Sequence, residues 1–202
     1  MVLVVGGDGS ILRIAPDAAR NDLPILGVNT GKLGFMSELD THELRYLRQL
    51  QQGQYTIDTR MMLDVNVLRQ GEKVYSACIL NDVVITKWPL VRLINISLSI
   101  NGTLTTSMRG DGIIVSTPTG STAYTLSAGG PIVSPEFTGL VFVPIAAHTI
   151  QARAFLTSPA DAVEIAVSHD RPSDPAISVD GQFVTCAGRI ERVVARRGDA
   201  DV

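Results

Sequence analysis

The sequence predicts a chain of two parts, a short α/β segment followed by a larger β-rich, sandwich-like domain. Residues 2–5 and 24–28 are short apolar runs with a helical stretch between them, which is the βα pattern of a parallel sheet. From about residue 56 the pattern changes to alternating apolar and polar residues, interrupted by glycine-containing turns. We therefore expect a small α/β segment over residues 1–57 and a larger β-rich domain over residues 58–202.

The α/β segment begins with a strand at residues 2–5. The glycines of the stretch GGDGS, residues 6–10, end this strand at once. The Ser10 hydroxyl is placed to cap a helix running from Ile11, because it can accept a hydrogen bond from an unpaired amide. We expect Pro16 to interrupt that helix, since proline lacks the amide donor.

A second helix is predicted at residues 41–52, THELRYLRQLQQ. Its leucines recur at helical spacing, Thr41 supplies a capping hydroxyl with a glutamate behind it, and Gly53 ends it. The larger part has strand-like alternation at 62–86, 92–117, 162–168, 176–185 and 189–197. The Asn-Gly pair at 101–102 is a typical hairpin turn.

Composition excludes several classes of protein. The chain has 202 residues, a formal net charge of −3 and 45% hydrophobic residues. This charge predicts no nucleic-acid partner, and the lack of an 18-residue apolar run predicts no membrane span. The two cysteines, Cys78 and Cys186, have no metal-like spacing. We therefore expect a reduced, cytoplasmic protein.

The first motif with chemical meaning is the glycine turn itself. A strand, a glycine turn and a helix start commonly hold phosphate, because the backbone approaches closely and amide groups face the anion. Asp8 is unexpected there, since a carboxylate repels phosphate. Its presence suggests either a metal ion or a hydroxyl group to be activated.

The second motif is residues 109–133, RGDGIIVSTPTGSTAYTLSAGGPIV. A buried strand leads into a segment dense in hydroxyl groups, with a short helix predicted from Thr122 and Gly129–Gly130 ending it. Small polar side chains around one aromatic residue, Tyr124, suit a sugar or nucleotide better than a bare ion. The alternative is an ordinary loop rich in serine and threonine.

These residues resemble the NAD kinase family. The resemblance rests on GGDGS (6–10), NTGKLGF (29–35), NDVVI (81–85), residues 110–133, HTIQAR (148–153) and DGQ (180–182), which together span nearly the whole chain. The GGDG element alone also occurs in lipid kinases and phosphofructokinases. The downstream motifs of those two classes are absent, whereas the long central motif is specific.

The resemblance implies an activity and a fold. NAD kinases transfer a phosphoryl group from ATP, or in some members polyphosphate, to the 2′-hydroxyl of the adenosine ribose of NAD. They use a divalent metal, Mg²⁺ or Mn²⁺, and form homodimers or homotetramers. Their fold is an incomplete Rossmann-like domain joined to an all-β domain, with the active site between the two.

The resemblance also assigns roles to residues of this chain. Asp8 is the catalytic aspartate, and the phosphate-donor loop is Gly6, Gly7, Gly9 and Ser10. The residues implied to bind NAD are Gly9, Arg13, Phe35, Asn81, Asp82, Arg92, Arg109, Asp111, Thr122, Ala123, Tyr124, Thr125, Leu126, Ser127 and Gln182. No residue is assigned as a metal ligand.

Within that set, the resemblance implies particular contacts. Asn81 and Asp82 bind ribose hydroxyls, with Asp82 standing where the family more often has the longer Glu. Asp111 lies near the nicotinamide carboxamide and Phe35 at the adenine end. Arg92 and Arg109 balance the negative charge of the phosphates. The implied site also includes Arg13, Thr122–Ser127 and Gln182.

Most of these residues also have a simpler interpretation. Asp8 can cap a turn, and Asn81 with Asp82 can form a turn at a strand end. Arg92 can lie on a solvated strand face, Tyr124 can pack in the core, and Gln182 falls in a hairpin turn. His148 is interpreted as a structural hydrogen bonder, because no further histidine or cysteine lies near it at ligand spacing.

Two further expectations concern the whole chain. Relative to the family, it looks shortened at both ends, so we expect Val2–Val5 to be partly exposed and NAD binding to be better preserved than catalysis. A catalytically weak NAD-binding or sensor module of the same fold is therefore the alternative function. The edge-rich β domain predicts a homo-oligomer.

Overall fold

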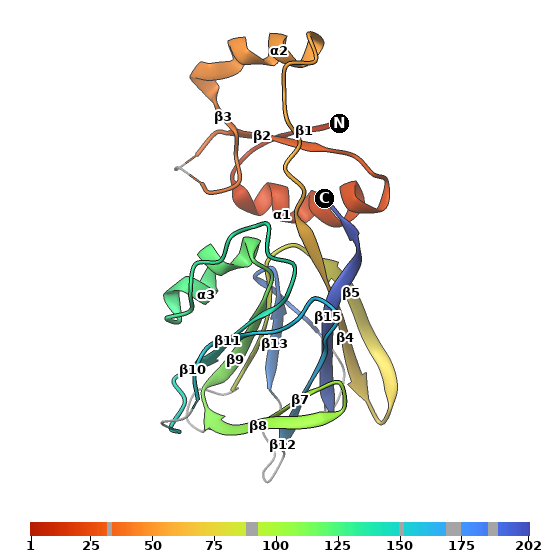
Figure 1. Cartoon of the computed structure of the whole chain (residues 1–202), viewed down its shortest axis with the longest axis vertical. Coiled ribbons are helices and arrows are strands. Elements are labelled where there is room, and N and C mark those ends of the chain that lie inside the picture. The colour runs from red at the N-terminus through yellow and green to blue at the C-terminus, as the bar shows by residue number, and fades with distance from the viewer. Residues whose placement is uncertain (32–33, 88–92, 150–151, 169–174, 186–189) are drawn as a thin grey trace. The chain divides into compact units, whose positions relative to one another are not determined.

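The computed structural model describes residues 1–31, 34–87, 93–149, 152–168, 175–185 and 190–202. The chain divides into two compact units (Figure 1). Unit 1 contains residues 1–60 together with 200–202, and unit 2 contains residues 61–199. The sequence placed the boundary at 57/58, and the structure divides the chain at 60/61.

Unit 1 is built on a small parallel sheet. Strand β1 (Val2–Val5) pairs with β2 (Ile25–Asn29), and β2 pairs with β3 (Leu39–Asp40). Helix α1 (Asp8–Arg20) connects the first two strands and buries an apolar stripe made of Ile11, Ala15, Ala18 and Ala19. The i, i+4, i+7, i+8 spacing places these four residues on one helix face. The βαβ arrangement predicted from the sequence is confirmed.

The start of α1 differs from the prediction. The helix begins at Asp8 and its N-cap is Gly7, which is extended (φ −94°, ψ −176°), so Ser10 lies inside the first turn instead of capping it. Pro16 does not interrupt the helix either. A proline forfeits one amide hydrogen bond, and the buried stripe on both sides of Pro16 keeps the two halves continuous. In β1, Leu3 and Val5 are exposed whereas Val4 is buried.

The segment 41–52 is less regular than its leucine spacing predicted. Thr41–Tyr46 forms a 3₁₀ helix (η1), and only Leu47–Gln51 is α-helical (α2). The cap is Asp40, not Thr41: its backbone N–H donates to Glu43 Oε2 at 3.0 Å in a capping box. No residue of η1 or α2 is buried, so packing within the described chain does not enforce a regular helix.

Unit 2 contains two six-stranded sheets, as the sandwich-like prediction required (Figure 1). One sheet has the strand order β11-β10-β9-β6-β13-β14 and the other β5-β4-β15-β12-β7-β8. Strand bounds in the first sheet are β6 Asp82–Thr86, β9 Gly112–Ser116, β10 Val141–Ile145, β11 Phe155–Leu156, β13 Ala176–Val179 and β14 Gln182–Phe183. Those in the second are β4 Met61–Arg69, β5 Glu72–Ile79, β7 Ile94–Ile100, β8 Thr103–Gly110, β12 Ala162–Ser168 and β15 Arg192–Asp201.

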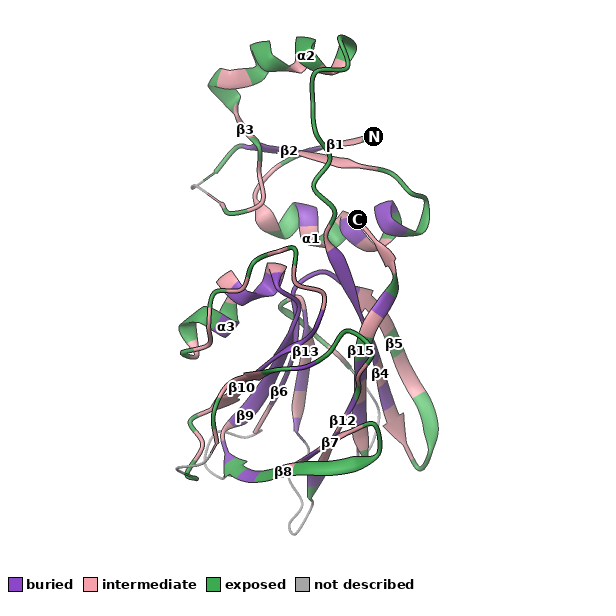
Figure 2. Ribbon diagram, viewed as in Figure 1, coloured by how far each residue is buried: buried purple, intermediate pink, exposed green. Residues whose placement is uncertain are grey.

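The main core of unit 2 draws apolar side chains from both sheets. Val65, Leu98 and Ile165 come from one sheet, and Ile113 and Phe142 from the other; all are at most 1% exposed. Alternate residues of β7 and β12, and of β4 from Leu63 to Val67, are buried, as one-faced burial requires. Strand β9 is different, because all five of its residues are buried (Figure 2). This strand carries the chain from the core to the hydroxyl-rich segment.

Among the described residues, no helix is both long and apolar enough to cross a membrane.

Candidate active site

The glycine turn leads directly from β1 into α1. Gly6 N–H donates to Val28 O at 2.9 Å, which ties the turn to the neighbouring strand β2. A Cβ on Gly6 would lie 2.4 Å from Ser10 Oγ, whereas a Cβ on Gly7 or Gly9 would meet nothing within 4 Å among the described residues. A side chain at position 6 would therefore force the Ser10 side chain to move. Gly7 and Gly9 leave open space beside the helix start, as a phosphate loop needs.

Asp8 faces a second loop instead of its own helix. Its Oδ2 accepts a hydrogen bond from Phe35 N at 2.9 Å, and its Oδ1 accepts one from Met36 N at 3.3 Å. Gly34 is packed so closely that an added Cβ would lie 2.2 Å from Asp8 Oδ1. Asp8 therefore does not cap its own turn: it accepts hydrogen bonds from the backbone of Phe35 and Met36. The carboxylate is oriented by residues 34–36, and each of its oxygens retains a lone pair for another donor.

Two other residues that the resemblance assigns to unit 1 are exposed. Arg13 lies on the outer face of α1, and the Phe35 side chain is 79% exposed while its backbone binds Asp8. An aromatic ring left this exposed has apolar area available for a ligand. Their roles in NAD binding remain predictions.

In unit 2 the segment Leu80–Asp82 meets the end of β9. Asp82 pairs with Ser116 across the two strands, and Thr117 follows immediately. Thr117 N donates to Asn81 O at 2.8 Å, and Thr117 Oγ1 donates to Leu80 O at 2.6 Å. These bonds bring the NDVVI motif and the long central motif together, although they are about thirty residues apart in sequence.

Two buried side-chain oxygens here have no hydrogen-bond partner among the described residues. They are Asn81 Oδ1 and Thr125 Oγ1, and both belong to the set implied to bind NAD. Asn81 is 8% exposed and Thr125 fully buried. Because an unpaired buried polar group costs about 1–3 kcal/mol, such atoms are often completed by a ligand or a water.

Asp82 has an unusual ionisation. Burial, reinforced by the negative charge of Asp180, raises the pKa of Asp82 to about 7 from the ordinary value of 3.8. Burial also raises the pKa of Asp180, against three backbone N–H bonds that lower it. Asp82 is therefore largely protonated below neutral pH, when it can donate as well as accept a hydrogen bond.

Asp180 is the site residue that sequence reasoning missed. The motif DGQ was noted for Gln182, yet Gln182 is exposed at the start of β14, whereas Asp180 bonds to the Asn81–Asp82 segment. The available signal was an acidic residue next to a glycine in a hairpin turn. This signal is weak, because aspartate is common in turns for local reasons.

The hydroxyl-rich segment is compact. It comprises a 3₁₀ turn, η2 (Thr119–Thr122), and a single α-turn, α3 (Tyr124–Ser127), so the helix begins two residues later than predicted (Figure 1). Thr122 Oγ1 instead donates to Thr119 O at 3.3 Å and closes η2. Tyr124 is 45% exposed, which contradicts the core-packing alternative. Leu126 and Ser127 are also exposed, and Ala123 is half-buried.

The structure does not bring every assigned residue to this place. Asp111 directly precedes β9, so it lies at the opposite end of the strand from Ser116, about 17 Å away at the usual rise per residue. Asp111 forms an ion pair with Lys87 at 2.5 Å. Arg109 is exposed at the end of β8. Arg92 lies outside the described residues.

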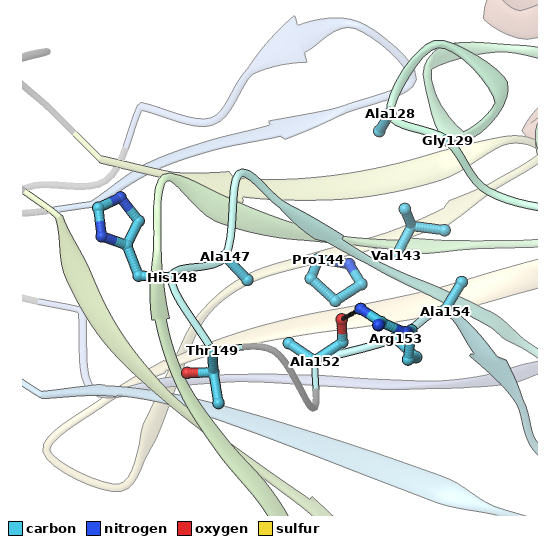
Figure 3. Close-up of a pocket in the computed structure, with 10 residues that line it drawn as sticks. All are labelled: Ala128, Gly129, Val143, Pro144, Ala147, His148, Thr149, Ala152, Arg153 and Ala154. Carbon is cyan, nitrogen blue, oxygen red and sulfur yellow. Dashed lines mark hydrogen bonds between the residues drawn. The ribbon is translucent and has the colours of Figure 1, made fainter.

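A separate open hollow of about 500 Å³ lies between the end of α3 and strand β10 (Figure 3). Its walls include Gly129, Val143, His148 and Arg153. The His148 ring lies at one margin, away from Val143 (Figure 3), and its backbone N–H donates to Arg109 O at 2.8 Å. This bond involves the backbone alone, so the structural role expected of the His148 side chain stays a prediction.

Among the described residues, one group of side chains has ligand atoms close enough for a metal: Asp40, His42 and Glu43. Glu43 is engaged by the Asp40 backbone, and Asp40 Oδ1 accepts from Asn29 Nδ2 at 3.1 Å. The capping of η1 and the bond to Asn29 thus give these two carboxylates a structural role that needs no metal.

The described residues define a chain with a glycine-loop α/β unit and a second unit of two six-stranded β-sheets. Residues 1–55 match the ATP-NAD kinase N-terminal domain and residues 80–201 match the ATP-NAD kinase C-terminal domain. The chain belongs to the NAD kinase family.

Curated relatives support the same assignment. The chain is 43% identical over 187 residues to an NAD kinase of Lachnoclostridium phytofermentans, covering 90% of this chain and 66% of the relative. It is 43% identical over 189 residues to an NAD kinase of Ectopseudomonas mendocina, covering 93% of this chain and 64% of the relative. The chain thus spans just under two thirds of the length of these relatives.

Two solved structures share the fold. Yeast NADH kinase complexed with NADH superposes with a TM-score of 0.88 at 26% identity, covering 97% of this chain and 57% of that one. An NAD kinase from Archaeoglobus fulgidus in complex with ATP gives a TM-score of 0.74 at 24% identity, covering 99% of this chain and 75% of that one.

Proposed function

We propose that this chain is an NAD kinase, which phosphorylates the 2′-hydroxyl of the adenosine ribose of NAD to give NADP. One observation carries the proposal. The glycine loop lies in the part of the chain that matches the N-terminal family domain, and the hydroxyl-rich segment lies in the part that matches the C-terminal family domain. The unpaired Asn81 Oδ1 and Thr125 Oγ1 support a polar ligand in unit 2.

In the proposed reaction, the 2′-oxygen forms a bond to the terminal phosphorus of ATP as the bond to the ADP oxygen breaks. The Asp8 carboxylate orients the hydroxyl and takes its proton. Its fixed bonds to the Phe35 and Met36 amides hold it in one orientation, so little reorganisation is needed. Gly7 and Gly9 leave room for the donor phosphates.

For the acceptor, we propose that Asn81 and Asp82 bind ribose hydroxyls and that residues 122–127 hold the nicotinamide half. Asn81 Oδ1 can accept from one hydroxyl, and the protonated Asp82 can donate to another. The exposed side chains of Arg13, Phe35 and Gln182 complete the proposed contacts. Arg109 and Asp111 remain predicted contacts that a single copy does not bring to Asn81.

We propose ATP as donor, with polyphosphate as the alternative. We propose that a divalent ion binds together with the donor phosphates, because Mg²⁺ is commonly held by substrate phosphates and only one or two carboxylates. The group Asp40, His42 and Glu43 already has a structural role in capping η1, so we assign none of its side chains to this ion.

We also propose a homodimer or homotetramer in the cytoplasm. Strand β8 is an edge strand of its sheet, and Leu104 on it is 62% exposed. An unpaired edge of this kind favours association with another copy. Light scattering at micromolar concentration tests the assembly, and a monomer would contradict it.

The test of the activity is NADP formation, measured with a dehydrogenase specific for NADP. The chain is incubated with NAD and Mg²⁺ and with ATP, polyphosphate or no donor. NADP appearing only with a donor supports the proposal and identifies the donor. NAD binding by calorimetry without any NADP formation would reject it in favour of a binding module.

A further inference from the structure

Asp180 connects two segments that are about 100 residues apart. Its Oδ2 accepts from Leu80 N at 3.0 Å, and its Oδ1 accepts from Asn81 N at 2.9 Å and from Asp82 N at 3.1 Å. Asp180 N donates back to Asp82 O at 2.9 Å. One carboxylate thus binds three consecutive backbone amides, and bonds to an ionised acceptor are the stronger kind.

The opposite side of the same segment is also fixed. Thr117 binds the carbonyl oxygens of Leu80 and Asn81 through its hydroxyl and its amide. Gly120 lies against Asn81 so closely that an added Cβ would lie 2.4 Å from the Asn81 carbonyl oxygen. The backbone amides and carbonyls of residues 80–82 are therefore bound by Asp180 and Thr117. This leaves the side chains of Asn81 and Asp82 for other partners.

Asp180 keeps this position at a conformational cost. It has φ +44°, in the left-handed region, and Gly181 follows with φ +75°. Non-glycine residues seldom adopt this region, although Asp and Asn tolerate it best. This two-residue Asp-Gly loop, which is a common hairpin turn, thus presents the Asp180 carboxylate to the segment that carries Asn81 and Asp82.

We propose, on the basis of the function proposed above, that Asp180 is a positioning residue of the dinucleotide site. It holds the backbone of Leu80–Asp82 so that the Asn81 and Asp82 side chains meet the ribose hydroxyls. It acts through these two residues, since both of its own oxygens are already engaged by backbone amides.

The variant that tests this is Asp180→Asn. Asparagine suits φ +44° but offers one acceptor oxygen instead of two, so at least one of the three amides loses its partner. We expect the KM for NAD to rise about tenfold or more, with the KM for ATP changed by less than about twofold. A purely structural residue would not separate the two substrates in this way.

The matched control is Asp161→Asn. Asp161 also accepts hydrogen bonds within a turn of unit 2, from Ser158 N and Asn101 Nδ2, but it has no bond to residues 80–82. We expect both KM values to stay within about twofold in this variant. Asp180→Glu, which keeps the charge but displaces both oxygens by one methylene, should weaken NAD binding less than Asp180→Asn.

A measurement on the unmodified protein covers the case in which the variants fail to fold. The amides of Leu80, Asn81 and Asp82 should exchange with solvent about as slowly as those of β9. Exchange at loop rates would overturn the inference, as would an unchanged KM for NAD in a folded Asp180→Asn. If the unmodified chain binds no NAD, the proposed function fails first and the inference falls with it.

Discussion

The backbone N–H of Phe35 donates a 2.9 Å hydrogen bond to Asp8 Oδ2 across 27 residues of sequence. The helix-start aspartate is therefore oriented by a neighbouring loop instead of by its own helix. In the proposed mechanism this bond sets the direction in which the carboxylate meets the ribose hydroxyl.

Asp8→Asn should reduce turnover by about 10²-fold or more, with the affinity for NAD changed only a few fold. The amide side chain cannot take the proton, and one of the two backbone donors loses its acceptor. Steady-state NADP formation and calorimetry measure the two effects. The control is Asp17→Asn on the same helix, whose carboxylate pairs with the exposed Arg20. Near-full activity in Asp8→Asn would reduce Asp8 to a structural residue.

Gly34→Ala should impair the same site without changing any ionisable group. The added Cβ would lie 2.2 Å from Asp8 Oδ1, so either the carboxylate or the loop must shift. We expect turnover to fall by about tenfold to a hundredfold, since small displacements of a reacting group are costly. Gly31→Ala is the control, because its Cβ meets nothing within 4 Å among the described residues. Equal rates in the two variants would contradict the proposed positioning.

Asn81→Ala should weaken NAD binding about fivefold to 150-fold, the equivalent of about 1–3 kcal/mol for a buried hydrogen bond to the ligand. Asn81 Oδ1 has no hydrogen-bond partner among the described residues, so it is available to bind a hydroxyl of the ligand, and alanine removes that bond. The control is Asn66→Ala on β4, where the side chain bonds to Ser76. Calorimetry showing unchanged affinity would remove Asn81 from the site.

Asp82 should make the stability of the chain depend on pH. Its pKa is raised in the folded state, to about 7 against 3.8, so the folded protein holds a proton that the unfolded chain releases. The contribution of Asp82 is therefore fully present below about pH 4 and is lost as the pH rises toward 7, by about 2–4 kcal/mol in total. Asp180 acts in the same direction, since burial raises its pKa too.

The measurement is the free energy of unfolding in denaturant at a series of pH values for the unmodified chain and for Asp82→Asn. As the pH rises from 4 to 7, the free energy of unfolding of the unmodified chain should fall relative to that of Asp82→Asn. Parallel profiles would show that Asp82 has an ordinary pKa.

Removing divalent ions should separate catalysis from binding. With excess chelator we expect NADP formation to stop, because the donor phosphates lose their counter-ion, and NAD affinity to stay within about twofold. Added Mg²⁺ should restore the rate. Loss of NAD binding in the chelator would place the metal in the acceptor site.

Sequence patterns determined the classes of structure and the order of the motifs. Alternation over β4, β7 and β12 predicted strands correctly, because one-faced burial imposes a two-residue period. The glycine turn after Val2–Val5 likewise predicted a strand-to-helix connection. These features depend on neighbours within a few residues, so they can be read locally.

Only the tertiary structure decided which residues meet. The helix start at Asp8 depends on Gly7 adopting an extended backbone, and the bonding of Asp8 depends on a loop 27 residues away. Asp180 reaches Asn81 because β13 pairs with β6, while the register of β6 with β9 separates Asp111 from Asp82. Strand order and register follow from packing over the whole sheet, and no short stretch of sequence encodes them.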